Sequence, residues 1–531
     1  MKLSIMYIYP ILLWGLVVFS TAYGNEITIS GQNEARYARG EQPESSADES
    51  YGYLENYLEL NTNIDKFRIY LRQSYKIPSE FGYKNFGLNA IDKRYIEYRD
   101  KHISIRGGDF YRSWGSGLLF GNVEFLELNL DTGLEGILIE SSRNNFDISA
   151  FRGVESDSTS EFREAAEGAY ISYLIPHNFI PYKIRLGGSL SRLDEGVRHP
   201  QINRHGFEIE GEFGVLNLYT AYVSDKLDSL NSGWKKYHNG FYSTATVYGV
   251  GWGLLFEYKN YELFTYNDPG NVGGVTDYPS LQYPATGVPE ATIYLMDRHP
   301  RLAHYYDDLG IQIEGTASYE DWGFSVNYNM SSEHDGQSLL PKLEEEFSPY
   351  RAFFAHIEHH PWNGNRMVFQ GSYSENIEFT HTVNEGGYSL WFQRIGLGGI
   401  YEYKIDNRYS LEIDLQLMQE SDKSPGRGDV HWEEYIAISL SRSPNLVGTF
   451  VVERTEDNSE VGANDWSDGW LGFIGGGGLY WPSAEVVVDF YERHQMRLFY
   501  GYERGGLRCT GGVCRVVNPF KGAKIIFTSY F

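Results

Sequence analysis

Apolar and charged residues alternate with a period of two through most of this chain. Residues 207–213 read Phe-Glu-Ile-Glu-Gly-Glu-Phe, which places the apolar side chains on one face of a strand and three Glu on the other. The same pattern recurs at residues 67–72 and 411–417. Such strands fit either a soluble sandwich with a shared core or a barrel whose apolar face meets lipid.

The spacing of turns separates these two folds. Short turns are expected at residues 64–65, 100–101, 143–144, 177–178, 259–260, 320–321, 405–407, 443–445 and 492–494. Longer loops lie between them, at residues 39–50, 78–91, 154–168, 193–203, 267–309, 331–350 and 456–468. Short turns at one end and long loops at the other are typical of outer-membrane barrels, with the short side periplasmic.

We therefore predict an all-β fold, a transmembrane antiparallel β-barrel of about 24 strands (22–26) with long extracellular loops. Essentially no helix is expected after residue 24. Lys2, an apolar stretch at 5–19, and Ala22 and Gly24 predict a signal peptide over residues 1–24 and a barrel domain over 25–531. The localisation that follows is the bacterial outer membrane.

The last strand fits this address. Phe527 and the terminal Phe531 lie on one apolar face, which is typical of the signal that outer-membrane assembly machinery reads. The expected partners are outer-membrane lipid and that machinery. A net charge of −26 argues against nucleic acid, whose binding requires stripes of Lys and Arg. A surface or periplasmic protein partner is left open.

Charged side chains on the polar faces are expected to line the lumen. The predicted lumen-facing residues are Arg68, Arg72, Glu208, Glu210, Glu212, Glu412 and Asp414. Charges facing the lumen of a wide barrel either tune ion selectivity or pair to hold a plug. The row of Glu predicts an acidic lumen.

One segment, residues 107–127, breaks the alternation. Its glycines permit tight turns and close backbone approach, at positions Gly107, Gly108, Gly115, Gly117 and Gly121. A barrel of this size needs something to narrow it. We predict that the segment folds into the lumen and that Tyr111, Arg112 and Trp114 form a constriction, the alternative being an outward extracellular loop.

Cys509 and Cys514 flank a Gly-Gly turn in RCTGGVCR. In an exported chain such a pair predicts a small disulfide, in the extracellular loop before the last strand. Catalytic motifs are scarce, so we expect no enzyme activity and no cofactor. His356, Glu358 and His360 have a spacing that a metal site could use, but a polar lumen face also produces such a trio, and no metal is expected.

The chain also resembles a known family. GDFYRSWGSGLLF followed by DTGLEG, the stretch MDRHPRLAHYYDDLG, and the closing RGGLRCTGGVCRVVNPFKG with its terminal Phe are similar to an uncharacterised, Bacteroidota-type family of predicted outer-membrane proteins, a domain of unknown function. The resemblance spans most of the mature chain. It implies a barrel in an outer membrane and carries no activity.

These observations favour a channel or porin-like conduit for cations or polar solutes with an inward loop. The alternative is a structural or docking barrel of a surface export or attachment system, without transport. A TonB-type active transporter is disfavoured, because we see no room for its plug domain before the first strand. The substrate, and whether the lumen is open or plugged, do not follow from the sequence.

Overall fold

The computed structural model describes most of the chain after residue 26. The described residues are 27–42, 49–80, 88–128, 130–155, 165–176, 183–194, 201–228, 235–264, 281–286, 293–299, 301, 305–336, 338–361, 364–382, 386–424, 428–457, 464–465, 478–510 and 513–531. The predicted signal peptide lies outside the described residues.

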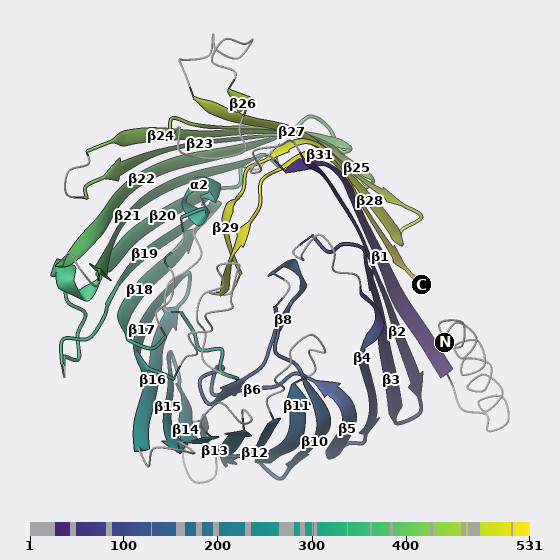
Figure 1. Ribbon diagram of the computed structural model, residues 1–531, viewed down its shortest axis with the longest axis vertical. Helices are drawn as coiled ribbons and strands as arrows, with labels where there is room; N and C mark the ends of the chain where they lie inside the picture. The colour runs from purple at the N-terminus through teal and green to yellow at the C-terminus, as the bar shows by residue number, and fades with distance from the viewer. Residues whose placement is uncertain are drawn as a thin grey trace.

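The wall is a closed ring of 24 antiparallel strands, as the sequence predicts (Figure 1). Its first half comprises β1 (Ile27–Gln42), β2 (Glu49–Ile64), β3 (Phe67–Lys76), β4 (Leu88–Arg99), β5 (Ile103–Phe110), β10 (Leu134–Arg143), β11 (Phe146–Glu155), β12 (Ala165–Ile175), β13 (Lys183–Asp194), β14 (Gln201–Phe213), β15 (Leu216–Asp228) and β16 (Lys235–Gly249). The second half comprises β17 (Trp252–Glu262), β18 (Asp308–Tyr319), β19 (Trp322–Ser332), β20 (Tyr350–His359), β21 (Arg366–Thr382), β22 (Gly386–Lys404), β23 (Tyr409–Asp422), β24 (Val430–Arg442), β25 (Leu446–Thr455), β27 (Leu479–Phe490), β28 (His494–Glu503) and β31 (Phe520–Tyr530).

The ring closes between its first and last strands. β1 pairs with β31 from Gln32 opposite Tyr530 to Glu41 opposite Lys521. The terminal Phe531 continues this ladder, because its N–H donates to the Gly31 carbonyl at 3.0 Å and its carbonyl accepts from the Gly31 N–H at 2.9 Å. Closure leaves no unpaired strand edge, which is what a sheet in lipid requires.

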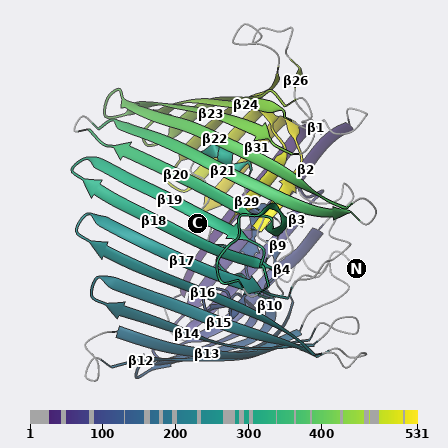
Figure 2. The same cartoon turned by 90° about the vertical axis from the view of Figure 1, so that its left-hand side faces the viewer.

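Short turns gather at one end of the barrel, along the left edge of Figure 2. One predicted turn is wrong. Residues 259–260 lie inside β17, and the chain turns instead at 250–251, where Gly251 has a φ of +75°. The polarity of Lys259 alone suggests a turn, but its side chain is buried and pairs with Asp308. The alternation of short turns with longer loops also has an exception, because only residues 383–385 separate β21 from β22.

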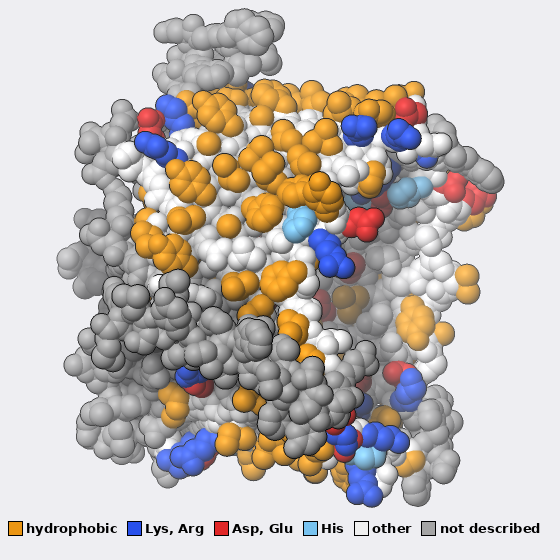
Figure 3. Space-filling model, turned by 90° about the vertical axis from the view of Figure 1, so that its right-hand side faces the viewer, with side chains coloured by type: hydrophobic (Ala, Val, Ile, Leu, Met, Phe, Trp, Pro, Cys, Tyr) orange, Lys and Arg blue, Asp and Glu red, His pale blue; other side chains and the backbone are white. Residues whose placement is uncertain are grey.

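Apolar side chains cover the outer face of the wall. Figure 3 shows them over the side of the ring where β1 meets β31. On the outer face Leu190 is 68% exposed and Leu397 is 61% exposed. Exposing such side chains to water costs about 25 cal/mol per Å² of apolar surface. Lipid removes that cost, so this face is the one that the membrane covers.

The remaining elements are short. Among the described residues helix is limited to α2 (Tyr294–Asp297) and the 3-10 turns η1 (Leu126–Leu128) and η2 (Glu345–Phe347), and none of these is long and apolar enough to cross a membrane. The other strands outside the ring are β6 (Ser113–Trp114), β7 (Phe120–Gly121), β8 (Glu124–Phe125), β9 (Leu130–Asp131), β26 (Asn464–Asp465), β29 (Gly506–Thr510) and β30 (Val513–Val517).

Candidate functional site

The connection between β5 and β10, residues 111–133, turns into the ring and is here called the inner loop (Figure 1). It contains two small hairpins, β6 with β7 and β8 with β9. Asn122 stabilises the base of the inner loop. Its side-chain NH2 group donates to the Phe110 carbonyl at 3.0 Å, and its side-chain oxygen accepts from the Arg112 N–H at 2.5 Å. The predicted constriction residues Tyr111, Arg112 and Trp114 all belong to this loop.

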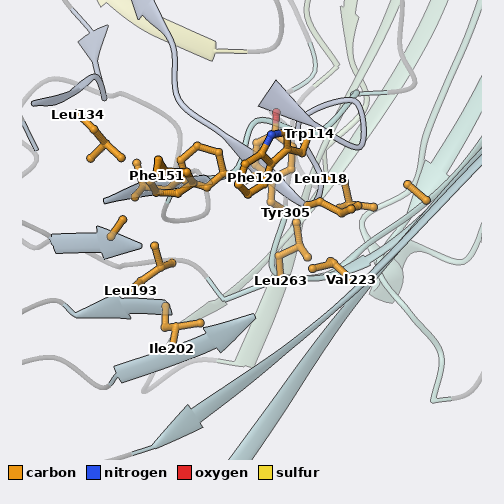
Figure 4. Close-up of a cluster of buried hydrophobic side chains, with 14 of the residues drawn as sticks. Trp114, Leu118, Phe120, Leu134, Phe151, Leu193, Ile202, Val223, Leu263 and Tyr305 are labelled. Carbon is orange, nitrogen blue, oxygen red and sulfur yellow. The ribbon is translucent and has the colours of Figure 1, made fainter. Parts of the chain in front are cut away.

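The tip of the inner loop packs against the inward faces of the neighbouring strands (Figure 4). Trp114 and Phe120 lie against Phe151 of β11, with ring centroids 5.3 and 4.5 Å away. Leu118 and Leu119 are also buried in this cluster. Its wall members include Ala166, Leu193, Ile202, Ala221, Val223, Tyr242 and Tyr261. An apolar core therefore fills one side of the lumen, which period-two alternation alone does not predict.

Charged and hydroxyl groups fix the other half of the inner loop. Arg72 of β3 lies 2.9 Å from Asp92 on the wall and 2.5 Å from Glu124 of β8, with its side chain 4% exposed. The Tyr111 hydroxyl donates to Asp131 at 3.0 Å. Burial raises the pKa of Tyr111, and the Asp131 carboxylate raises it further, so this hydroxyl stays protonated and keeps donating. The inner loop is therefore held to the wall at two places, by the apolar cluster at its tip and by Arg72 at Glu124.

The described parts of the connection between β17 and β18, residues 263–264, 281–286, 293–299, 301 and 305–307, are here called the long loop, and they contact the inner loop. The Gly121 N–H donates to the Leu281 carbonyl and the Tyr283 N–H donates to the Gly117 carbonyl, each at 2.9 Å. Gly117 has a φ of +82°, and a Cβ there would lie 1.9 Å from the Tyr283 carbonyl oxygen. Only glycine allows the two backbones this close.

A buried ion pair anchors the same part of the long loop to the wall. Arg204 of β14 donates to both carboxylate oxygens of Asp225 on β15, at 2.8 and 2.9 Å. A third donor of the same guanidinium reaches the Leu281 carbonyl at 3.2 Å. The side chains of Arg204 and Asp225 are 1% and 0% exposed. Neither residue stood out in the sequence, because cross-strand partners become visible only when the register is known.

Further along, the long loop places α2 on the opposite wall. The Leu295 N–H donates to the Gln416 side chain on β23 at 3.1 Å, and the Tyr294 hydroxyl donates to Glu453 on β25 at 2.9 Å. His299 lies 3.5 Å from Glu433, which Arg504 also binds through two hydrogen bonds at 2.8 and 3.1 Å. The long loop therefore reaches from β14 to β25 across the lumen.

The hairpin of β29 and β30 follows Arg504 and also points into the ring (Figure 1). Arg298 beside α2 donates to the Gly505 carbonyl at its base. The hairpin lies in the connection between β28 and the last strand, β31, where the two cysteines are predicted to pair. The hairpin register places Cys509 opposite Cys514, and their side chains lie outside the described residues.

The disulfide stays a prediction. Thiol-specific labelling of the unreduced, denatured protein is expected to modify neither Cys509 nor Cys514, and both after reduction. Opposed residues of a two-stranded hairpin have the Cβ separation that a disulfide needs. Quantitative labelling before reduction would rule the bridge out.

The residues predicted to line the lumen lie on the face opposite the exposed apolar side chains. Many of the acids among them are already partnered. Glu208 accepts from the hydroxyls of Tyr170 and Tyr219, and Glu212 lies 2.6 Å from Lys183. Glu210 lies 3.8 Å from Arg185, and Asp414 accepts from Gln416. Glu412 faces the same interior. The basic Arg68 donates to Asn61.

The remaining sequence predictions concern the end of the last strand and a His-Glu-His trio. Phe527 of β31 lies opposite Ala35 of β1, and the terminal Phe531 extends this pairing at Gly31. Glu358 of the His356, Glu358, His360 trio lies 2.6 Å from Arg366 and 2.9 Å from His360. No metal-binding group of three or more ligands occurs among the described residues.

A closed antiparallel ring with an apolar outer face and a polar, partly filled interior defines a transmembrane β-barrel of the outer-membrane type. The chain belongs to the family of unknown function DUF6029, whose model matches residues 3–531. No curated protein matches the sequence.

Several solved outer-membrane proteins are similar in structure. The siderophore receptor PirA from Pseudomonas aeruginosa has a TM-score of 0.43 and 10% identity, over 95% of this chain and 80% of that one. OccAB1 from Acinetobacter baumannii has a TM-score of 0.38 and 11% identity, over 71% of this chain and 96% of that one. The outer-membrane protein OpdK from Pseudomonas aeruginosa has a TM-score of 0.38 and 10% identity, over 78% and 98%. Likeness at this level does not identify a cargo.

Proposed function

We propose that this barrel is a gated outer-membrane conduit for polar solutes, closed in the present conformation by its inner and long loops. The observation that carries the proposal is the inward surface of β18 to β23. Beside apolar and charged residues, its buried side chains include many amides and hydroxyls, among them Gln312, Asn327, Asn329, Gln370, Ser372, Ser374 and Gln416. A barrel that served only as an anchor would gain stability from an apolar filling at these positions.

Several of these polar atoms are not used in holding the protein together. The side-chain oxygens of Gln312, Asn329, Gln370 and Ser374 have no hydrogen-bond partner among the described residues. Buried polar atoms without protein partners usually bind water. A hydrated strip along the wall supports passage of polar molecules.

Polar solutes are favoured over cations by the pairing of the lumen acids. A cation pathway requires carboxylates that are free to replace the hydration shell of the ion. Glu208 and Glu212 are occupied by Tyr hydroxyls and by Lys183. The acidic row therefore has fewer free carboxylate oxygens than its sequence suggests.

Swelling of protein-containing liposomes tests the proposal. With neutral polyols of increasing size outside, we expect uptake of the small ones above the protein-free rate and a sharp size limit. Exclusion of every polyol, with an intact barrel by circular dichroism, would contradict the conduit. It would favour a structural or docking barrel without transport.

A further inference from the structure

We propose that the cavity beneath the inner loop is a binding site for a small, neutral, polyhydroxylated solute such as a mono- or disaccharide. The proposal rests on the proposed conduit function and names the class of solute that this conduit would hold. It is carried by the shape of the cavity, its unused donors and its balance of charge.

The cavity lies between the inner loop and the short-turn mouth of the barrel. Its volume is about 520 Å³, within the range of sites that hold small ligands. Arg112 and Trp114 of the inner loop line one side. The short turn before β5 lines the mouth, together with Ser142 of β10 and Asp147 of β11. A solute here would contact the loop that closes the lumen.

Two buried groups at this cavity have no protein partner. Ser149 is 3% exposed, and its hydroxyl has no hydrogen-bond partner among the described residues. Trp114 is also 3% exposed, and its indole N–H is unpartnered in the same part of the chain. Both residues line the cavity. Leaving a buried donor or acceptor unsatisfied costs free energy, so a ligand or water that binds both groups is favoured there.

The charges at the cavity are balanced. Four basic side chains of Lys and Arg and four acidic side chains line it. The inner ones are paired with one another, since Arg112 lies 2.7 Å from Glu140 and Arg185 lies 2.5 Å from Asp147. A charged ligand in contact with any of these four side chains would compete with one of the two pairs. A neutral hydroxyl compound can instead donate to the carboxylates and accept from the guanidinium groups while both pairs remain.

Hydroxyls and an aromatic pair complete the lining. Serines line the cavity, and three of their hydroxyls already donate to carboxylates, namely Ser104 to Glu97 and Ser142 and Ser172 to Asp147. Each of these oxygens can still accept a hydrogen bond from a sugar hydroxyl. Trp114 stacks on Tyr170, with ring centroids 5.6 Å apart and planes 18° apart. Trp114 is buried on its other sides, so the half-buried Tyr170 ring is the one that can contact the apolar C–H face of a sugar.

Calorimetric titration of the purified, full-length barrel in detergent tests the site. The probes are glucose and maltose as neutral sugars and glucuronate as an anion, at equal ionic strength. We expect saturable binding of at least one neutral sugar and weaker or no binding of glucuronate. Ser149→Ala should lower the affinity about two- to tenfold, the effect of one lost hydrogen bond.

A second serine provides the matched control. Ser191 of β13 is buried, its hydroxyl likewise has no partner among the described residues, and it does not line the cavity. Neither Ser149→Ala nor Ser191→Ala removes a bond within the described protein, so both should fold normally, and Ser191→Ala should bind sugar like the wild type. Equal loss in both variants, or tighter binding of glucuronate than of glucose, overturns the proposal.

Absence of binding by every probe in a folded barrel would mean that the cavity holds water only, which also overturns it. Failure of the sugar site can be distinguished from failure of the proposed conduit function. Polyol uptake without sugar binding contradicts this site alone, whereas sugar binding without any uptake contradicts the conduit and leaves the site in place.

Discussion

Deletion of residues 113–120 is expected to turn a nearly silent barrel into one that carries a steady ion current. The deletion removes Trp114, Leu118, Leu119 and Phe120, the side chains that fill the lumen beside β11 to β17. Ser113 pairs with Gly121, and the Asn122 N–H donates to the Arg112 carbonyl at 3.2 Å, so the ends to be joined already lie together. Conductance should rise by about an order of magnitude or more, because wide barrels are closed mainly by what fills them.

Single-channel recording in planar bilayers measures this effect. A deletion of residues 338–343 is the control, because that loop exposes Leu339 and Leu340 and its Leu339 carbonyl accepts from Tyr258 on the outer face. It should leave the current unchanged. An unaltered current in a well-folded 113–120 deletion would contradict a closing role for the inner loop.

Replacement of Arg204 by Leu is expected to cost about 3–5 kcal/mol of stability, because it leaves the Asp225 carboxylate buried without a counter-charge. It also removes the hydrogen bond that holds the Leu281 carbonyl of the long loop. The double variant Arg204→Leu, Asp225→Leu removes both charges and should recover most of the loss. Denaturant unfolding in detergent, followed by tryptophan fluorescence, compares the three proteins.

An exposed ion pair serves as the control. Lys183 and Glu212 lie 2.6 Å apart with side chains 53% and 46% exposed. Lys183→Leu should therefore leave the stability nearly unchanged. Equal stability of the Arg204 single and double variants would show that Asp225 is not left unpaired, and that the buried pair does not anchor the long loop.

The wall was predictable because lipid imposes a simple rule on every strand. Phe207 and Ile209 face outward and Glu208 faces inward by period two alone, and the terminal Phe531 extends the last ladder. The turn predicted at 259–260 failed where polarity was the only guide. Lys259 is polar because it pairs with Asp308 inside the barrel.

The filling of the lumen was less predictable. The broken alternation and clustered glycines of the inner loop mark it as exceptional, and Gly117 and Gly121 do lie where backbones meet. The contacts of Arg204, α2 and Arg504 join positions far apart in sequence, and only the closed ring brings them together. Trp114 was singled out as a constriction residue, but its stacking on Tyr170 depends on the register of β12.

In the gated conduit that we propose, passage of a solute requires the inner loop and the long loop to separate. An engineered disulfide between them tests it most directly. A Cβ built on Gly121 lies 2.9 Å from the Tyr283 nitrogen and 3.1 Å from the Tyr283 Cβ. A separation of the two backbones by less than about 1 Å therefore relieves the close contact and gives the Cβ separation of about 3.5–4.5 Å in a disulfide. Single-channel currents of the Gly121→Cys, Tyr283→Cys variant should show no openings when oxidised and regain the wild-type openings after reduction, with the same reductant leaving the wild type unchanged. Identical openings in the oxidised and reduced states, with the cross-link confirmed by mass spectrometry, would contradict the account.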